Sequence, residues 1–261
     1  MPAGQAVSPE IKASSHDMDH VHFTDRGRSV VVRTWAEAAV RTALNYSTLH
    51  EWASVQQSRE AMQGRGVHYG VLLPTDPPTA AVVRRNRHGG LFGSLTGEYF
   101  LLPTRAPLEL EIMLRLAASG VPVPEIIGYV IYPAVGIFAR SDVITRRLPQ
   151  GNDLPAAWNN ASPTEREAIL EQTRILLEKL EKAGAWHADL NMKNIYIACT
   201  PAGPAAYLLD VDRVTFPNSR DVALRNFKRL ARSVRKWRNQ KGLDFCEDAL
   251  ARLTPCGREG R

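Results

Sequence analysis

The stretch that decides the fold of this chain is His187–Asn194, which reads H-A-D-L-N-M-K-N. It fits the pattern H-x-D-L-x-x-x-N. A second stretch, Leu208–Asp212, reads L-L-D-V-D and places an aspartate at the end of an apolar run. Aspartate and asparagine also favour simple turns, but that preference does not explain three polar residue types at these spacings. The two stretches together indicate a loop that carries chemistry.

The residues between these two stretches predict a β-hairpin. Residues 195–198 and 206–211 have the composition of strands, and the segment between them contains two prolines and a glycine. Because a hairpin returns its end to its beginning, we expect Asn194 and Asp210 to lie side by side. Two oxygen ligands beside the carboxylate of Asp189 suit Mg²⁺ that bridges nucleotide phosphates.

The pattern assigns roles to the polar residues that match it. We expect Asp189 to orient an attacking hydroxyl or to accept its proton, and Asn194 and Asp210 to be the metal ligands. His187 is expected to brace the loop through hydrogen bonds rather than to transfer protons. Asp212 is the second choice for the metal ligand, after Asp210.

A well-marked helix start precedes the loop. Ser162 can serve as N-cap, Pro163 occupies the first helical position and Glu165 completes a capping box. An apolar face follows, and Gly184 ends the helix directly before the loop. We therefore expect the loop to emerge from a long amphipathic helix.

The first half of the chain contains candidate nucleotide-binding groups. Gly64 and Gly66 precede a strand-like run at residues 67–73, so backbone N–H groups here could approach phosphates. A plain turn explains them equally well, because Tyr69 stands where a third glycine is usual. A second strand is expected at residues 80–84. Its Arg84 either reaches a phosphate-binding cleft or belongs to an exposed basic turn.

A helix is expected from an N-cap at Thr104 to Gly120. Its residue Glu109 lies on the same face as three apolar residues, and an unpaired carboxylate buried there would cost several kcal/mol. We expect Glu109 to pair with Arg84. Pairing with Arg105 or Arg115 is the alternative.

The remaining segments predict a tail and two lobes. Residues 34–62 look mainly helical, strands are expected at 126–132 and 137–145, and Thr145–Gly151 is the expected hinge. The expected organisation is a mobile N-terminal tail (1–26), an N-lobe with a nucleotide-binding sheet and helix (27–148) and a C-lobe with the catalytic loop, the metal site and a basic C-terminal helix (149–261). Histidines and aspartates of the tail could hold a metal, but a solvated tail is the preferred interpretation.

Composition sets broad limits on the class of protein. The 261 residues carry a net charge of +6, which favours an anionic partner such as phosphate, nucleic acid or an acidic membrane surface. Three scattered cysteines form no disulfide framework, so a reducing compartment is expected. The N-terminus has no signal-peptide pattern, and the apolar stretch 126–139 is too short to span a bilayer. We expect a soluble or peripheral protein.

Residues 220–238 predict a basic amphipathic helix, with eight arginines and lysines against one aspartate. One interpretation is a helix that packs on the C-lobe with a solvated charged face. The other is a face that contacts anionic headgroups or a phosphorylated glycolipid. Nucleic acid has no further support in the sequence, and we do not expect it as a partner.

The chain resembles the 3-deoxy-D-manno-octulosonic acid (Kdo) kinase and lipopolysaccharide core kinase family of Gram-negative bacteria, within the protein-kinase-like superfamily. The segments that carry the resemblance are Gly64-Arg65-Gly66, Val83–Gly93, Arg105 with Glu109, Gly120–Pro124, Ser141–Thr145, His187–Asn191, Asp210–Arg213 and the basic helix from Asn226 to Lys236.

The resemblance implies an α+β, bilobal protein-kinase-like fold with an antiparallel-sheet N-lobe and a mainly helical C-lobe. It also implies an enzyme that uses ATP and Mg²⁺ to phosphorylate a sugar hydroxyl. For Kdo kinases this is the 4-hydroxyl of Kdo linked to lipid A, and the enzyme is peripheral at the cytoplasmic face of the inner membrane. Two departures stand out: Arg84 occupies the place of the lysine of protein kinases, and the N-terminal extension has no counterpart.

The expected function is therefore that of a lipopolysaccharide inner-core kinase with Kdo–lipid A as its acceptor. A core heptose kinase, or another small-molecule or protein kinase of the superfamily, is the first alternative. An inactive kinase-fold protein that binds anionic membranes is an alternative of another class. The complete set of Asp189, Asn194 and Asp210 argues against inactivity.

Overall fold

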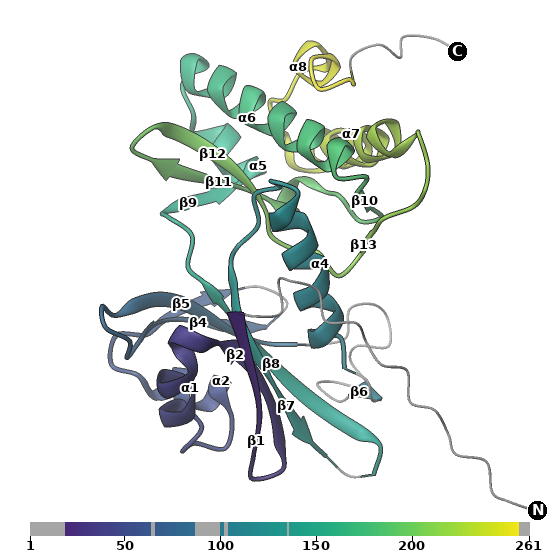
Figure 1. The fold of residues 1–261 in the computed structure, drawn as a ribbon. Coiled ribbons are helices and arrows are strands. Elements are labelled where there is room, and N and C mark those ends of the chain that lie inside the picture. The colour runs from purple at the N-terminus through teal and green to yellow at the C-terminus, as the bar shows by residue number, and fades with distance from the viewer. Residues whose placement is uncertain (1–18, 64–65, 87–99, 102–103, 135, 256–261) are drawn as a thin grey trace, which may run out of the picture.

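Antiparallel strands form most of the first half of the chain (Figure 1). The computed structural model describes residues 19–63, 66–86, 100–101, 104–134 and 136–255. Within these residues, one sheet has the strand order β1-β2-β7-β8-β5-β4-β3, and β6 pairs with β8. The strands are β1 His20–Asp25, β2 Arg28–Arg33, β3 Glu60–Gln63, β4 Val67–Leu73, β5 Thr79–Arg85, β6 Phe100–Leu101, β7 Ile126–Pro133 and β8 Phe138–Arg146.

Helices cover both faces of this sheet. Successive residues of a strand point to opposite sides, so the central strands contribute side chains to the core on each face. In β2, Val30 and Val32 are buried against the helices that follow it, whereas Val31 joins the core around a later helix. The first group of helices is η2 Thr34–Ala36, α1 Glu37–Ala43 and α2 Leu49–Val55, and the later helix is α4 Ala106–Ala118. The sheet is thus held between two apolar cores.

The second half of the chain is mainly helical, with two small sheets. Its elements are β9 Gly151–Asp153, α5 Leu154–Asn160, α6 Pro163–Lys182, β10 Trp186–His187, η3 Met192–Asn194, β11 Ile195–Thr200, β12 Gly203–Leu208, β13 Val214–Thr215, α7 Val222–Lys241 and α8 Glu247–Ala251. One small sheet has the order β12-β11-β9, and the other pairs β10 with β13. This mixed architecture confirms the expected α+β fold class with an antiparallel first half.

Helix α4 joins the two halves, and it lies between them in Figure 1. Its Met113 and Leu116 are buried in the same apolar core as Leu176 of α6. After the helix, the carbonyl oxygen of Pro122 accepts a hydrogen bond of 2.9 Å from the N–H of Leu208 in β12. The division of the chain into lobes at residues 148 and 149 stays a prediction.

Two local predictions around the loop are confirmed. The Ser162 hydroxyl accepts a bond of 3.4 Å from the N–H of Glu165, whose carboxylate accepts one of 2.8 Å from the N–H of Ser162. The expected hairpin is β11 and β12, in which Ile195 pairs with Leu208 and Thr200 with Gly203. The loop therefore has a capped helix on one side and a hairpin on the other.

The prediction of a mobile tail over residues 1–26 was wrong for its last part. Residues His20–Asp25 form β1, which pairs with β2 from His20 opposite Arg33 to Asp25 opposite Arg28. The turn between them places Arg26 at φ +47° and Gly27 at φ +77°, the two positive angles of a tight hairpin turn. Alternation puts Val21 and Phe23 on the apolar core. Residues 1–18 lie outside the described part.

Two further boundaries differ from the expectation. The region 34–62 contains η2, α1 and α2, but its end is the strand β3, whose Glu60 pairs with Gly70 of β4. The helix expected after Thr104 begins at Ala106 with Arg105 at its N-cap, and no side chain caps it. Thr104 is buried, and Arg105 forms an ion pair described below. Within the described residues, no helix is long and apolar enough to cross a membrane.

The close approach of β9 to β11 gives a first prediction. A Cβ atom on Gly151 would lie 2.0 Å from the carbonyl oxygen of Ile197. We expect Gly151→Ala to lower the free energy of unfolding by about 1–3 kcal/mol, the usual cost of overpacking. Urea denaturation measures this, with Asn152→Ala at the neighbouring exposed position as the control. Equal stability of the two variants would contradict the prediction.

Candidate active site

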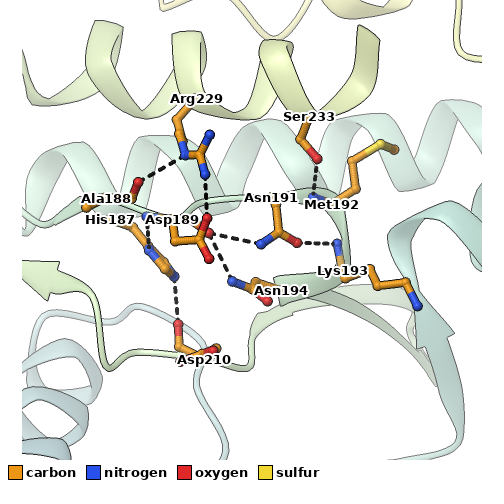
Figure 2. A network of polar contacts seen from close by, with 10 residues as sticks. All are labelled: His187, Ala188, Asp189, Asn191, Met192, Lys193, Asn194, Asp210, Arg229 and Ser233. Carbon is orange, nitrogen blue, oxygen red and sulfur yellow. Dashed lines mark hydrogen bonds and ion pairs between the residues drawn. The ribbon is translucent and has the colours of Figure 1, made fainter. Parts of the chain in front are cut away.

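The backbone of Asp189 and of the residue before it is held by four side chains of the loop and of α7 (Figure 2). Asn191 and Asn194 both donate their amide N–H to its carbonyl oxygen, at 3.1 and 3.0 Å. Its N–H donates to Nδ1 of His187 at 3.2 Å. The preceding carbonyl, that of Ala188, accepts a bond of 3.0 Å from Nε of Arg229. These contacts leave the Asp189 carboxylate fixed at its base and partly exposed.

His187 joins the loop to the end of the hairpin. It is fully buried, and its Nε2 lies 2.6 Å from the carbonyl oxygen of Asp210. Because that carbonyl only accepts and the Asp189 N–H only donates, the ring must carry its proton on Nε2 and accept at Nδ1. One neutral tautomer satisfies both bonds. The structure thus agrees with a bracing role for His187.

Burial lowers the pKa of His187, and the nearby Asp210 and Asp189 act in the opposite direction without reversing this. The neutral ring is therefore the form that the fold favours.

The hairpin brings the two expected metal ligands together. The N–H of Leu209 donates to the carbonyl oxygen of Asn194 at 2.9 Å, so Asp210 follows directly after the residue bonded to Asn194. The Asn194 amide nitrogen is engaged by Asp189, which leaves its oxygen as the possible ligand atom. An amide oxygen and a carboxylate are hard donors that fit Mg²⁺. Asn194 and Asp210 are the residues that would hold it.

An ion pair from the other half of the chain faces this site. Arg84 of β5 is paired with Glu109 of α4, a carboxylate that is 7% exposed. Burial lowers the pKa of Arg84, and the charges of Asp210 and Asp212 act in the opposite direction, so both aspartates lie within its electrostatic reach. The expected Arg84–Glu109 pair is present.

The other candidate partners of Glu109 are engaged elsewhere. Arg105 is paired with Asp212 at 3.1 Å, and Arg115 lies over the ring of Phe216, with its guanidinium carbon 3.6 Å from the ring centre. One carboxylate oxygen of Asp210 also accepts a bond of 3.3 Å, from the N–H of Asp212, so the order of metal candidates with Asp210 first stays a prediction.

The Gly-x-Gly motif lies between two antiparallel strands. Gln63 of β3 pairs with Val67 of β4, so the motif connects the ends of a hairpin at the sheet edge. Gly64 lies outside the described residues, and Gly66 forms a bend. A contact of this turn with phosphates stays a prediction.

Sequence reasoning missed a polar row on α7 that supports the loop. Asn226 accepts from the N–H of His187 at 3.0 Å and donates to the carbonyl of Ala185 at 2.8 Å. Arg229 is paired with the Asp189 carboxylate in addition to its bond to Ala188. The Ser233 hydroxyl accepts from the N–H of Met192 at 3.2 Å.

The spacing of this row contains a signal that could have been read. Asn226, Arg229 and Ser233 are separated by three and four residues, so they share one face of the helix. They also flank the buried residues Leu230 and Val234. Polar side chains beside an apolar stripe indicate contacts with an adjacent segment.

The neutral state of His187 gives a pH prediction. In the unfolded chain this histidine takes up a proton below about pH 6.5, while the fold keeps its pKa lower. Its stabilising contribution is therefore present above that pH and is lost as the pH falls toward the folded pKa. We expect the stability advantage of wild type over His187→Gln to shrink between pH 7.5 and 5. Urea denaturation across this range tests it, and a constant or growing advantage would be incompatible.

Comparison with known proteins agrees with this geometry. A family model described as the lipopolysaccharide kinase (Kdo/WaaP) family matches residues 51–250. The 3-deoxy-D-manno-octulosonic acid kinase of Vibrio parahaemolyticus is 28% identical over 207 residues, covering 78% of this chain and 83% of the relative. The enzyme of that name from Xylella fastidiosa strain M12 is 32% identical over 179 residues, covering 66% and 69%.

A solved structure titled "WaaP in complex with acyl carrier protein" has a TM-score of 0.48 and 14% identity, covering 78% of this chain and 80% of that one. The family match spans most of the chain, and it includes every residue of the site described above. This chain belongs to the lipopolysaccharide kinase (Kdo/WaaP) family.

Proposed function

We propose that this chain is an ATP-dependent kinase of lipopolysaccharide inner-core biosynthesis that phosphorylates a hydroxyl of Kdo linked to lipid A, with the 4-hydroxyl as the proposed position. The observation that carries the proposal is one site made from both halves of the chain. Asp189, Asn194 and Asp210 come from the loop and hairpin, and the Arg84–Glu109 pair comes from the sheet and α4. A kinase needs both sets of groups at one place.

Each side chain has a proposed task in phosphoryl transfer. Asp189 orients the acceptor hydroxyl toward the γ-phosphate and receives its proton. Asn194 and Asp210 would hold Mg²⁺, which when bound would neutralise the charge of the phosphates. Arg84, kept in place by Glu109, contacts the ATP phosphates, since a guanidinium can bind phosphate oxygens in a bidentate way. Backbone N–H groups around Gly64 and Gly66 are proposed to cover the phosphates.

Most of the catalytic power of such a site comes from position. Little covalent chemistry falls to the protein in phosphoryl transfer, so an oriented hydroxyl and a neutralised phosphate account for most of the rate. The bonds of His187, Asn191 and Asn194 to Asp189 fix that orientation before the acceptor arrives.

The acceptor is proposed from the relatives, which are named as kinases of 3-deoxy-D-manno-octulosonic acid. A core heptose kinase or a kinase for another small molecule or protein would use the same catalytic groups. The acceptor pocket decides between these functions. An inactive fold is disfavoured, because the carboxylates and amides that the chemistry requires are all present and oriented.

The role of Asp189 gives a direct test. We expect Asp189→Ala to lower the turnover of labelled phosphate from ATP–Mg²⁺ to Kdo–lipid A by several orders of magnitude, because the hydroxyl loses its orienting group. Thermal unfolding should change little, since the carboxylate is partly exposed.

The control for this experiment is Asp248→Ala, at an exposed carboxylate of α8, which should leave turnover unchanged. A near-normal rate for Asp189→Ala would remove its proposed role. Label transfer by wild type to another acceptor, and none to Kdo–lipid A, would refute the proposed substrate.

A peripheral location at the cytoplasmic face of the inner membrane is proposed from the outer face of α7. A surface hollow of about 330 Å³ is lined by Phe227, Lys228, Ala231, Arg232 and Arg235. Apolar side chains beside exposed cations suit the boundary between acyl chains and phosphates of an anionic lipid. Because Kdo–lipid A is itself such a lipid, this face would lie next to the membrane that holds the acceptor.

Several of the basic residues at 220–238 contact other residues of the protein, which leaves fewer of them for contact with headgroups. Arg225 lies over the ring of Trp186 at 3.6 Å, and Arg229 faces the loop. Arg235 is paired with Glu247 at 3.1 Å. Lys228 and Arg232 are exposed and are the residues that we propose for headgroup contact.

Vesicle binding tests this part of the proposal. We expect Lys228→Gln together with Arg232→Gln to weaken binding to vesicles containing anionic lipid by about 10- to 30-fold, at roughly 1 kcal/mol for each basic residue near the surface. Sedimentation with vesicles at low and moderate salt measures this. Arg252→Gln directly after α8, which removes an arginine paired with Glu167, is the control. Unchanged binding of the double variant would leave α7 with a packing role alone.

A further inference from the structure

Arg229 differs from the other groups that hold the loop, because it carries a charge and remains partly exposed. Its Nε donates to the Ala188 carbonyl at 3.0 Å, and its Nη2 is paired with Oδ1 of Asp189. The side chain is 31% exposed, and that of Asp189 is 37% exposed. The guanidinium thus borders the position that an acceptor hydroxyl must occupy.

The hydrogen-bonding capacity of Arg229 exceeds what the loop uses. A guanidinium has five N–H donors in a planar fork. The two contacts with Ala188 and Asp189 engage Nε and Nη2, so the Nη1 donors can serve a bound molecule. Bracing the Ala188 carbonyl needs only a neutral donor, as Asn191 and Asn194 provide for Asp189. The positive charge pairs with the Asp189 carboxylate through Nη2, which leaves Nη1 able to bind a second anion.

A cation at this position would offset the electrostatic repulsion that an acidic acceptor meets here. Asp189, Asp210 and Asp212 place three carboxylates around the site, and ATP adds phosphates. A sugar that carries a carboxylate would be repelled from this position unless a cation lies close to it. Arg84 and Arg105 are paired with Glu109 and Asp212 on the side of α4. Arg229 comes from α7 and contacts Asp189 itself.

We propose that Arg229 determines the specificity of the site for an acidic sugar, by binding the carboxylate of the acceptor while its contact with Asp189 aims that residue at the hydroxyl. The proposal rests on the proposed function and adds to it the residue that recognises the acid group. A guanidinium suits this task, because it can bind one carboxylate through Nη2 and a second through Nη1.

The test crosses two substrates with three proteins. Kdo–lipid A and its derivative with the Kdo carboxylate converted to a carboxamide are offered in detergent micelles with ATP–Mg²⁺. For wild type, we expect kcat/KM to be about 10- to 100-fold higher for the acid, the range of a charge-assisted hydrogen bond. For Arg229→Gln this ratio should fall close to one, mainly through KM for the acid. Arg229→Lys, which keeps the charge, should recover part of the ratio.

The control is Arg174→Gln, which removes a partly exposed, ion-paired arginine of α6 and should keep the wild-type ratio. If Arg229→Gln lowers both rates equally and the ratio stays at its wild-type value, Arg229 only braces the loop and the proposal is overturned. If that variant has no measurable turnover, its affinities for the acid and the amide are measured without ATP. Their ratio is then compared with the wild-type ratio, with the same two outcomes. If wild type phosphorylates neither substrate but accepts another sugar, the proposed function itself fails.

Discussion

The site depends on the hydrogen bond between Nε2 of His187 and the carbonyl oxygen of Asp210. This bond ties the start of the loop to the end of the hairpin, two points that are 23 residues apart. It also fixes the tautomer, so that Nδ1 can accept from the N–H of Asp189. A buried neutral ring can hold both bonds only while it stays unprotonated, which is why its lowered pKa and its bracing position belong together.

Around this bond, one ion pair links the sheet to α4, and another links the start of α4 to the residues after β12. The pairs Arg84–Glu109 and Arg105–Asp212 involve α4, which packs on the sheet and on the core of the helical half. A partly exposed ion pair such as Arg105–Asp212 contributes little to stability on its own, whereas the buried Glu109 requires its partner. The value of both pairs here is geometric, because they bring the cation of β5 and the aspartates after β12 to one place.

Much of this arrangement follows from local sequence signals. The capping box at Ser162 and the strands after Asn194 are predicted from residues that lie close together in the sequence, and the structure contains both. The cost of burying an unpaired carboxylate predicted that Glu109 has a partner, and the resemblance to kinases pointed to Arg84 as that partner. The strand His20–Asp25 was missed, because its pairing depends on a turn with two positive φ angles, of which one falls on Arg26.

The support that α7 gives to the loop could not be derived from composition. Net charge describes a helix as a whole, whereas each side chain acts according to the face on which it lies. The spacing of Asn226, Arg229 and Ser233 places them on one face, away from Lys228 and Arg232. What that face contacts is known only from its packing against the loop.

This separation of faces explains how one helix can serve two purposes. The inner row fixes Asp189 through a backbone carbonyl and a carboxylate, and it must be rigid because a small displacement of the hydroxyl lowers the rate strongly. The outer face is proposed to contact a lipid surface, for which long exposed cations suffice. Since both faces belong to a single 20-residue helix, a lipid bound at the proposed outer face would keep a fixed distance from a hydroxyl oriented at Asp189. For an acceptor that is both a sugar and a lipid, that relation is what the chemistry requires.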